Sequence, residues 1–212
     1  MQVKDHIMYH YHNKEAYSDI WQEGNELIVD DNFNSNFCQF LNRYSTAVRV
    51  KGTDHETFQS FDNVLERYLN EDEFKKISPE LAKKMLEESI RIIRNANLCH
   101  REYLLEKYRL EHYPELPSRY HSIWLTSYDN LEYWKDRLKR GDSLKLFKVQ
   151  VTGNLFKSSD LFIPDDHFTL EEMYNQAEKY WNPNFEQEHS LEQVEYLFQG
   201  KVKILERIDF NN

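Results

Sequence analysis

Two histidines near the N-terminus, in the run Tyr9-His10-Tyr11-His12, have a spacing that occurs in metal sites. Alternate side chains of a β-strand point to the same face, so His10 and His12 are expected side by side. A zinc site needs at least one further protein ligand, and no spacing elsewhere in the sequence supplies one. We therefore favour two half-exposed histidines near a strand end and predict no metal. A third interpretation uses one imidazole alone, as a hydrogen-bonding group for a ligand hydroxyl.

A carboxylate interrupts an apolar run near the C-terminus, in Gln193-Val194-Glu195-Tyr196-Leu197-Phe198. Strand alternation puts Gln193 and Glu195 on one face. Burying a carboxylate among apolar side chains costs free energy unless the group is paired or used in chemistry. The sequence leaves two interpretations equally open: a functional carboxylate, or an edge strand on which Glu195 faces water.

The middle of the chain holds an aromatic strand with a hydroxyl on each side of its tryptophan, Ser122-Ile123-Trp124-Leu125-Thr126, after the turn Pro117-Ser118-Arg119. Alternation sends Trp124 and both hydroxyls to one face and the two aliphatic side chains to the other. Such a face suits a flat ligand with polar edges. From this segment alone, an interior strand with a core tryptophan is the favoured interpretation.

Familiar nucleotide and nucleophile motifs are absent from the sequence. The five glycines are dispersed and form neither G-x-G-x-x-G nor a P-loop, and no G-x-S-x-G or C-x-x-C occurs. Cys38 and Cys99 are far apart and lack metal-site spacing, so we expect reduced thiols in a cytosolic protein.

Composition predicts one folded domain over 1–212. The chain has 212 residues, of which 40% are hydrophobic and 30% charged, with a formal net charge of −10. That charge argues against a broad surface for nucleic acid or anionic membrane. No apolar run reaches transmembrane length and the start lacks a signal-peptide pattern, so we expect a cytoplasmic protein without a membrane partner.

The periodicity predicts an α+β fold with helices in the middle and most strands in the C-terminal half. Strands are expected over 7–12, 26–29, 144–151, 194–198 and 201–208, with short extended pieces at 155–157 and 161–163. Helical patterns cover about 56–111, 129–139 and 169–181, and a loop is expected over 44–54.

Capping residues indicate where two of the helices begin. Ser78 is expected as N-cap with Pro79 at the first helical position, and Thr169 as N-cap with Glu172 in a capping box. After Ser78, apolar residues recur at helical spacing and are expected to face a core: Leu81, Met85, Leu86, Ile90 and Ile93.

Four basic residues gather where the helix over 129–139 is expected to end near Gly141: Lys135, Arg137, Lys139 and Arg140. Cations there complement the helix dipole. The sequence assigns them no function.

In their order, these segments resemble the His–Tyr–Glu class of ADP-ribosyltransferases, which includes diphtheria toxin and the poly(ADP-ribose) polymerases. A Tyr-His strand comes first, then Ser-Ile-Trp-Leu-Thr, a helix with Tyr133-Trp134, and a final Glu-Tyr-Leu-Phe strand. More closely, the chain resembles a bacterial family of uncharacterised proteins with an ADP-ribosyltransferase-like fold, the domain of unknown function numbered 2441. The matching stretches cover most of 95–208 and part of 7–37: Arg101-Glu102-Tyr103 through Pro117-Ser118-Arg119, Leu144 to Lys157, Tyr180-Trp181, and Glu195 to Leu205.

The resemblance implies split antiparallel sheets, with the helical segment at about 56–111 inside a single domain, and a site for NAD as substrate. Glu195 would be the catalytic residue, holding the nicotinamide-ribose 2′-hydroxyl and stabilising an oxocarbenium-like transition state. His10 would bind the adenosine ribose. Tyr11 stands where the class often has a small residue.

The remaining implied roles concern the nicotinamide and the diphosphate. Trp124, where the class has a tyrosine, would stack on the pyridinium with Ser122 beside it. Tyr133 or Trp134 would form the opposite wall, and Arg119 would meet the diphosphate bidentately.

The function expected from this resemblance is NAD-dependent ADP-ribosyl transfer to an intracellular macromolecule, by a toxin or anti-phage effector. The net charge mildly favours a protein acceptor over nucleic acid. Two alternatives stay open: a non-catalytic module with the same fold that binds a nucleotide or a protein, and a metal-dependent hydrolase that uses His10 and His12.

Overall fold

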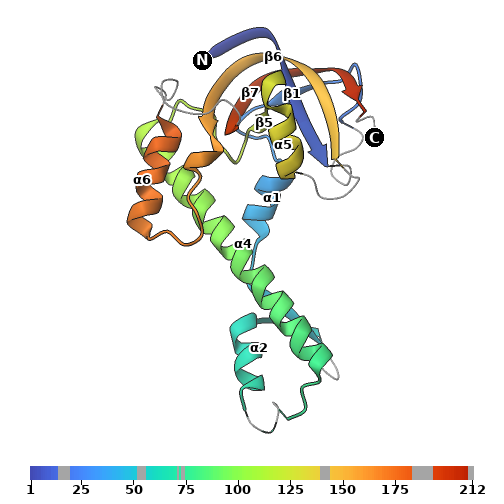
Figure 1. Ribbon diagram of the computed structural model, residues 1–212, viewed down its shortest axis with the longest axis vertical. Coiled ribbons are helices and arrows are strands. Elements are labelled where there is room, and N and C mark those ends of the chain that lie inside the picture. The colour runs from blue at the N-terminus through green and yellow to red at the C-terminus, as the bar shows by residue number, and fades with distance from the viewer. Residues whose placement is uncertain are drawn as a thin grey trace. The chain divides into compact units, whose positions relative to one another are not determined.

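Long antiparallel strands form the main sheet of the protein in the computed structural model (Figure 1). The structure describes residues 1–13, 20–51, 56–70, 72, 75–138, 144–182 and 193–209. The chain divides into two compact units, one made of residues 1–40 with 101–212 and the other of 41–100. The fold is therefore α+β with an antiparallel sheet, as the sequence predicts.

The main sheet lies in the first unit and has the order β1-β6-β7-β2, with β5 paired to β7. Its strands are β1 (Gln2–Asn13), β2 (Glu26–Val29), β5 (Ile123–Leu125), β6 (Leu144–Ser159) and β7 (Val194–Ile208). A bridge between Tyr9 and Thr126 also joins β1 to the end of β5. Strand β5 thus has β1 and β7 as neighbours, although it contributes only three residues.

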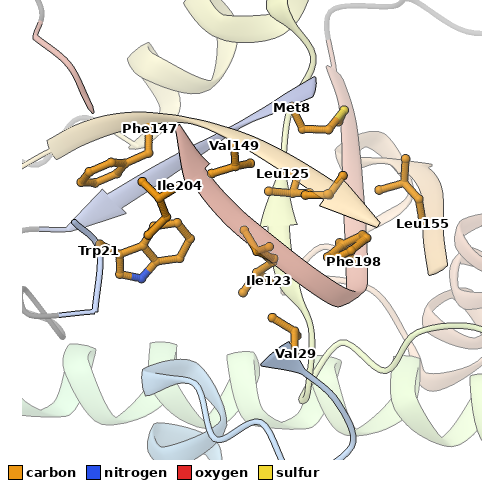
Figure 2. Packing of buried hydrophobic residues seen from close by; sticks show 12 residues of the cluster. Met8, Trp21, Val29, Ile123, Leu125, Phe147, Val149, Leu155, Phe198 and Ile204 are labelled. Carbon is orange, nitrogen blue, oxygen red and sulfur yellow. The ribbon is translucent and has the colours of Figure 1, made fainter. Parts of the chain in front are cut away.

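One face of the sheet encloses an apolar core. Alternate residues of the central strands point into it, among them Phe147, Val149 and Leu155 of β6. Figure 2 shows these side chains meeting Met8, Trp21 and residues of β5 and β7 inside the curved strands. The predicted alternation of β5 is confirmed, because Ile123 and Leu125 belong to this core whereas Trp124 does not.

The opposite face is covered by helices. It packs Phe156 and Leu197 of the sheet against Leu105 of α4 (Pro79–His112) and against Tyr180 and Trp181 of α6 (Leu170–Trp181). The Trp181 indole nitrogen donates to the Leu105 carbonyl at 2.7 Å, and the Ser158 hydroxyl donates to the Tyr180 carbonyl at 2.6 Å. These bonds fix α6 to α4 and to the sheet.

Both predicted helix starts are confirmed. Helix α4 begins at Pro79, and the Ser78 hydroxyl accepts from the Leu81 amide at 3.2 Å. Helix α6 has Thr169 as N-cap, with the reciprocal bonds of a capping box to Glu172. A third helix, α5 (Leu131–Leu138), is preceded directly by a short 3-10 helix over Tyr128–Asn130. The predicted end near Gly141, with Lys139 and Arg140, lies outside the described residues.

In the second unit the prediction was partly wrong. Residues 44–54, expected as a loop, include β3 (Ala47–Lys51). The first residues of the helical pattern expected over 56–111 form its partner strand, β4 (Glu56–Ser60). The helical pattern is realised only from α2 (Phe61–Tyr68) onward, and α1 (Asn36–Arg43) precedes the hairpin. The pairing of β3 with β4 outweighs the weak helical propensity of these residues.

The apolar stripe of α4 was also wrongly assigned to a core. Leu81, Leu86, Ile90 and Ile93 are 37–65% exposed, whereas Ile92 is buried. Periodicity identifies an amphipathic helix but does not say which elements cover it. No helix of the described residues is long and apolar enough to cross a membrane.

Two predicted breaks in the strands are absent. Strand β6 continues through Gly153, and β7 through Gly200, where a break was expected. The expected extended piece at 161–163 falls instead on a 3-10 helix over Asp160–Phe162. The glycines pair with each other across the ladder, and a Cβ on Gly153 would lie 2.3 Å from the Gln199 carbonyl oxygen and 2.7 Å from the Gly200 Cα. Close backbone approach, rather than a turn, explains these two glycines.

We predict that Gly153→Ala destabilises the protein by roughly 2–4 kcal/mol, because the added methyl group meets backbone atoms that cannot move independently of the sheet. Gly24→Ala is the matched control: Gly24 also has a positive φ, of 85°, but no atom lies within 4 Å of its virtual Cβ. Urea unfolding of both variants measures the difference. Equal losses of unfolding free energy would contradict the role given to close approach.

Candidate functional site

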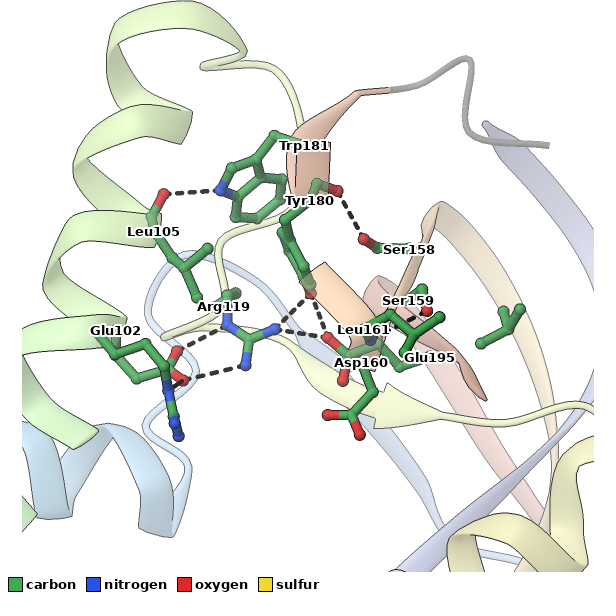
Figure 3. Close-up of polar contacts among 12 residues, drawn as sticks. Glu102, Leu105, Arg119, Ser158, Ser159, Asp160, Leu161, Tyr180, Trp181 and Glu195 are labelled. Carbon is green, nitrogen blue, oxygen red and sulfur yellow. Dashed lines mark hydrogen bonds and ion pairs between the residues drawn. The ribbon is translucent and has the colours of Figure 1, made fainter. Parts of the chain in front are cut away.

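A buried arginine contacts three side chains from distant parts of the sequence, shown in Figure 3. The Arg119 Nε donates to Glu102 Oε2 at 2.7 Å, and its Nη2 donates to Glu102 Oε1 at 3.2 Å. Its Nη1 donates to Glu195 Oε1 at 2.6 Å and also to the Tyr180 hydroxyl, which in turn donates to Glu195 Oε1. We call Glu102, Arg119, Tyr180 and Glu195 the Arg119 cluster.

Each member of the Arg119 cluster comes from a different element of the first unit. Glu102 lies on α4, Arg119 in the segment before β5, Tyr180 near the end of α6 and Glu195 at the start of β7. Arg119 is 3% exposed and Glu195 4% exposed. The interpretation in which Glu195 faces water from an edge strand is therefore wrong, because β7 is flanked by neighbours and α6 covers this face.

Electrostatics in the cluster favour a charged arginine and a protonated tyrosine. Burial alone would lower the pKa of Arg119, but the negative charges around it, Glu102 first, outweigh burial and hold the pKa well above its ordinary value. Burial also raises the pKa of the Tyr180 hydroxyl well above its ordinary value, against the opposing effect of Arg119. Tyr180 therefore keeps its proton at physiological pH and donates a hydrogen bond to Glu195.

A second buried ion pair, one helical turn further along α4, fixes the segment that carries Arg119. Glu106 lies four residues after Glu102 and so on the same helix face. Its Oε1 accepts from Arg109 at 2.7 Å and from the Ser118 hydroxyl at 2.8 Å. Arg109 also donates to the carbonyls of Pro114 and Leu116, at 3.0 and 2.9 Å. The pair holds the turn so that Arg119 is directed at Glu102.

Trp124 borders the Arg119 cluster on the same face of the sheet. The Arg119 guanidinium carbon lies 5.6 Å from the centroid of the indole and 4.9 Å from that of the Tyr180 ring. Phe37 meets the indole edge-on, with centroids 5.3 Å apart. A cation therefore already lies against Trp124, in the kind of position that the resemblance gives to a pyridinium.

Ser122 is fully buried, and its hydroxyl has no hydrogen-bond partner among the described residues. Strand alternation puts it on the face that carries Trp124. A buried hydroxyl without a partner costs free energy, and because Ser122 has no exposed surface a ligand would have to displace its neighbours to reach it.

His10 lies on the other face of the sheet from Glu195. It pairs in register with Phe147 and stacks on Trp21 with ring centroids 4.0 Å apart, and both partners belong to the first core. Its Nδ1 is 2.9 Å from the Trp124 carbonyl oxygen. Because a carbonyl only accepts, Nδ1 carries the proton and Nε2 is left as an acceptor. The structure thus brings Glu195, Trp124 and Arg119 together but separates His10 from them.

His10 is neutral at physiological pH. Burial lowers its pKa to about 3, although the bond to the Trp124 carbonyl opposes this, and nearby His12 lowers the pKa further. The His10 and His12 rings lie 5.8 Å apart, with Trp21 against both. The part of the chain that the structure describes contains no group of three residues able to hold a metal ion.

Helix α5 places the remaining predicted residues beside the start of β7. The Trp134 indole nitrogen donates to the Val194 carbonyl at 2.8 Å, next to Glu195. The Tyr133 hydroxyl donates to Asp160 Oδ2 at 2.9 Å, and the same oxygen lies 2.6 Å from Arg137 Nε. Burial and the bond to Asp160 raise the pKa of Tyr133 to about 12.

Two members of the Arg119 cluster, Glu102 and Tyr180, are not among the functional residues predicted from the sequence. One signal for Glu102 was present: it lies three residues before the core residue Leu105, so a carboxylate interrupts an apolar helix face. The resemblance implies a diphosphate contact for Arg119, whereas its guanidinium is directed to two protein carboxylates. This packing does not support that role.

The model of the family described as "Protein of unknown function (DUF2441)" matches residues 8–210. No curated protein matches the chain.

We predict that Arg119→Met lowers the unfolding free energy by about 3–5 kcal/mol, because it leaves two buried carboxylates without their cation. Arg207→Gln is the control, since Arg207 also pairs with a carboxylate, Asp209, but is 51% exposed at the side chain. Denaturant unfolding should show a change below about 0.5 kcal/mol for the control. A loss for Arg119→Met as small as that of the control would contradict a buried ion pair.

We also predict that His10 makes the protein less stable in mild acid. The unfolded chain binds a proton at His10 as pH falls through about 6.5, whereas the folded protein, with a pKa of about 3, does not. Stability that is present above pH 6.5 is therefore lost progressively between the two values.

The His10→Asn variant removes this titration and keeps an amide donor for the Trp124 carbonyl. Between pH 7.5 and pH 5, the native protein should lose roughly 1–2 kcal/mol more unfolding free energy than the variant. Parallel pH profiles of the two proteins would show that His10 is not buried in its neutral form.

Proposed function

We propose that this chain, which belongs to the DUF2441 family, is an NAD-dependent ADP-ribosyltransferase that acts on an intracellular macromolecule. Glu195 is the catalytic carboxylate in this proposal, and Trp124 with Ser122 forms the floor for the nicotinamide. The observation that carries the proposal is a buried carboxylate, held by Arg119 and Tyr180 beside an indole at the start of a central strand.

The neighbourhood of three strands supports the proposal. Strand β1 carries Tyr9-His10, β5 carries Trp124 and β7 carries Glu195, and β5 has both of the others as neighbours. Trp124 pairs in register with Leu197, and Glu195 lies two residues before Leu197 on β7, so Trp124 and Glu195 are on the same face of the sheet. The order of the motifs along the chain therefore corresponds to adjacency in the sheet.

The hydrogen bonds of Glu195 also support it. Among the described residues, both bonds that reach the carboxylate end on Oε1. Oε1 is thus fixed by two donors, and Oε2 is the oxygen left to accept from a ribose 2′-hydroxyl. A carboxylate that is fixed before the substrate binds stabilises developing positive charge without reorganising, and in a buried site the attraction is strong.

The proposed reaction is a substitution at the ribose carbon bonded to nicotinamide. The bond from this carbon to the pyridinium nitrogen breaks, and its electron pair leaves with neutral nicotinamide. Positive charge develops on the ribose, and Glu195 stabilises it electrostatically. A nucleophile of the acceptor then forms the new bond to the same carbon and loses its proton to solvent.

A second candidate function is a non-catalytic module that keeps the fold and binds a nucleotide or a protein. Two observations favour it: Arg119 neutralises part of the Glu195 charge, and His10 faces the other side of the sheet. In this case the Arg119 cluster has only a structural role, and the module would bind a ligand without turnover.

We predict that the purified protein, added to bacterial lysate with labelled NAD, transfers label to a macromolecule and releases nicotinamide. Glu195→Gln should lower both signals by at least about 100-fold, because the amide lacks the charge that stabilises the cation. Label recovered in protein rather than nucleic acid would agree with the net charge of −10.

Glu206→Gln is the control for the transfer assay. Glu206 is also a carboxylate of β7 and also pairs with a cation, Lys148, but its side chain is 50% exposed and it lies outside the Arg119 cluster. Activity in this variant together with its loss in Glu195→Gln would assign the chemistry to Glu195. If the native protein binds NAD, as judged by a thermal shift, but transfers no label and releases no nicotinamide, the non-catalytic module is the correct function.

A further inference from the structure

We propose that Arg137 is the phosphate-binding residue of this site and takes the diphosphate of the dinucleotide. The inference rests on the proposed function, in that it assumes an NAD-like ligand with its ribose at Glu195. It assigns a role to a residue that the sequence explains fully as a complement to the helix dipole.

The first step is that Arg119 is not available to an anion. Its Nε, Nη1 and Nη2 all donate to Glu102, Glu195 or Tyr180, and the residue is buried. To bind a diphosphate it would have to leave two buried carboxylates without a cation, at a cost of several kcal/mol. The site needs another cation for an anionic ligand.

The second step is that Arg137 is oriented but not saturated. Its side chain is 55% exposed, and its Nε lies 2.6 Å from Asp160 Oδ2. Among the described residues, no hydrogen bond or ion pair reaches its two terminal nitrogens. An arginine that is held by a carboxylate through Nε keeps its terminal N–H groups for a bidentate contact with phosphate oxygens.

Arg137 is also linked to the neighbourhood of Glu195. Ser158 pairs with Glu195 across the ladder, and Asp160 follows two residues later, so Figure 3 shows Asp160 beside Glu195. Helix α5, which carries Arg137, is tied to the residue before Glu195 through the Trp134 indole nitrogen. The Tyr133 hydroxyl reinforces the position of Asp160 from the same helix. Arg137 is therefore linked to the neighbourhood of Glu195 through Asp160 and through its own helix, and it is in this exposed position that we place the diphosphate of a ligand whose ribose binds Glu195.

The test measures binding of ADP and of adenosine by titration calorimetry to the full chain, without any need for turnover. Arg137→Gln should weaken ADP binding at least about 10-fold, and leave adenosine binding, which involves no phosphate, within about twofold. Arg207→Gln is the matched control, because Arg207 is also about half exposed and paired to an aspartate. It should leave both affinities unchanged.

Two further measurements separate a binding role from a structural one. The thermal midpoint of Arg137→Gln should fall by a few degrees, because Asp160, whose side chain is 9% exposed, loses its cation, so all affinities are measured well below the midpoints of both proteins. The ADP affinity of the native protein should fall with added salt more steeply than that of the variant. Arg137→Lys should recover only part of the affinity, because lysine lacks the planar fork.

The outcomes distinguish this inference from the proposed function. ADP affinity of Arg137→Gln within twofold of the native value overturns the inference, and so does a native protein that binds no ADP. If ADP binding depends on Arg137 but the lysate assay gives neither transfer nor free nicotinamide, the phosphate site stands and the transferase function falls.

Discussion

The ion pairs of Arg119 are the interaction on which the rest of the first unit depends. They join residues 102, 119, 180 and 195, which belong to two helices, a loop and a strand. Each charge that leaves water costs several kcal/mol, and a buried pair recovers this only with good geometry and additional hydrogen bonds. The cluster therefore contributes little net stability compared with an apolar core of the same size. The cluster instead makes the fold specific, because any other arrangement of these elements would leave a buried charge without a partner.

The charge balance of the cluster has a chemical consequence. Arg119 lies between two carboxylates, and Arg101 Nε lies 3.8 Å from Glu102 Oε1, so two arginines face two carboxylates. Glu102 is paired with both arginines, whereas Glu195 shares Arg119 with Glu102, so Glu195 is the less neutralised carboxylate. This agrees with the proposed stabilisation of a ribose cation by Glu195, and the pairing of both arginines with carboxylates disfavours direct contact of the cluster with phosphate. A cation outside the cluster is then needed for any anionic part of the ligand.

Local signals in the sequence were sufficient to predict the helices and strands that contribute to the site. They were insufficient to predict the tertiary contacts between these elements. The N-caps Ser78 and Thr169 and the alternation around Trp124 were predictable, since each depends on neighbouring residues alone. The pairing of Gly153 with Gly200 and the approach of Glu102 to Arg119 depend on tertiary contacts, which no local pattern encodes. The prediction for residues 44–60 of the second unit failed for the same reason, because strand pairing outweighed a helical pattern. For His10, the alternation of residue types predicts a strand but not which face of the sheet its side chain occupies. The register with Phe147 shows that it lies on the face of the apolar core.

Strand β5 shows how three residues can connect the two faces of the sheet. The Trp124 indole borders the Arg119 cluster on one face, while its carbonyl accepts from His10, whose ring packs on the other. A strand this short is not stable alone, so its position depends on pairing with β7 and on Arg119 just before it. A change in the ion pairs of Arg119 would therefore reach the Trp124 carbonyl, and through it the environment that keeps His10 neutral. Trp124 is thus the residue that links the charged cluster to the histidine, through its ring on one side and its carbonyl on the other.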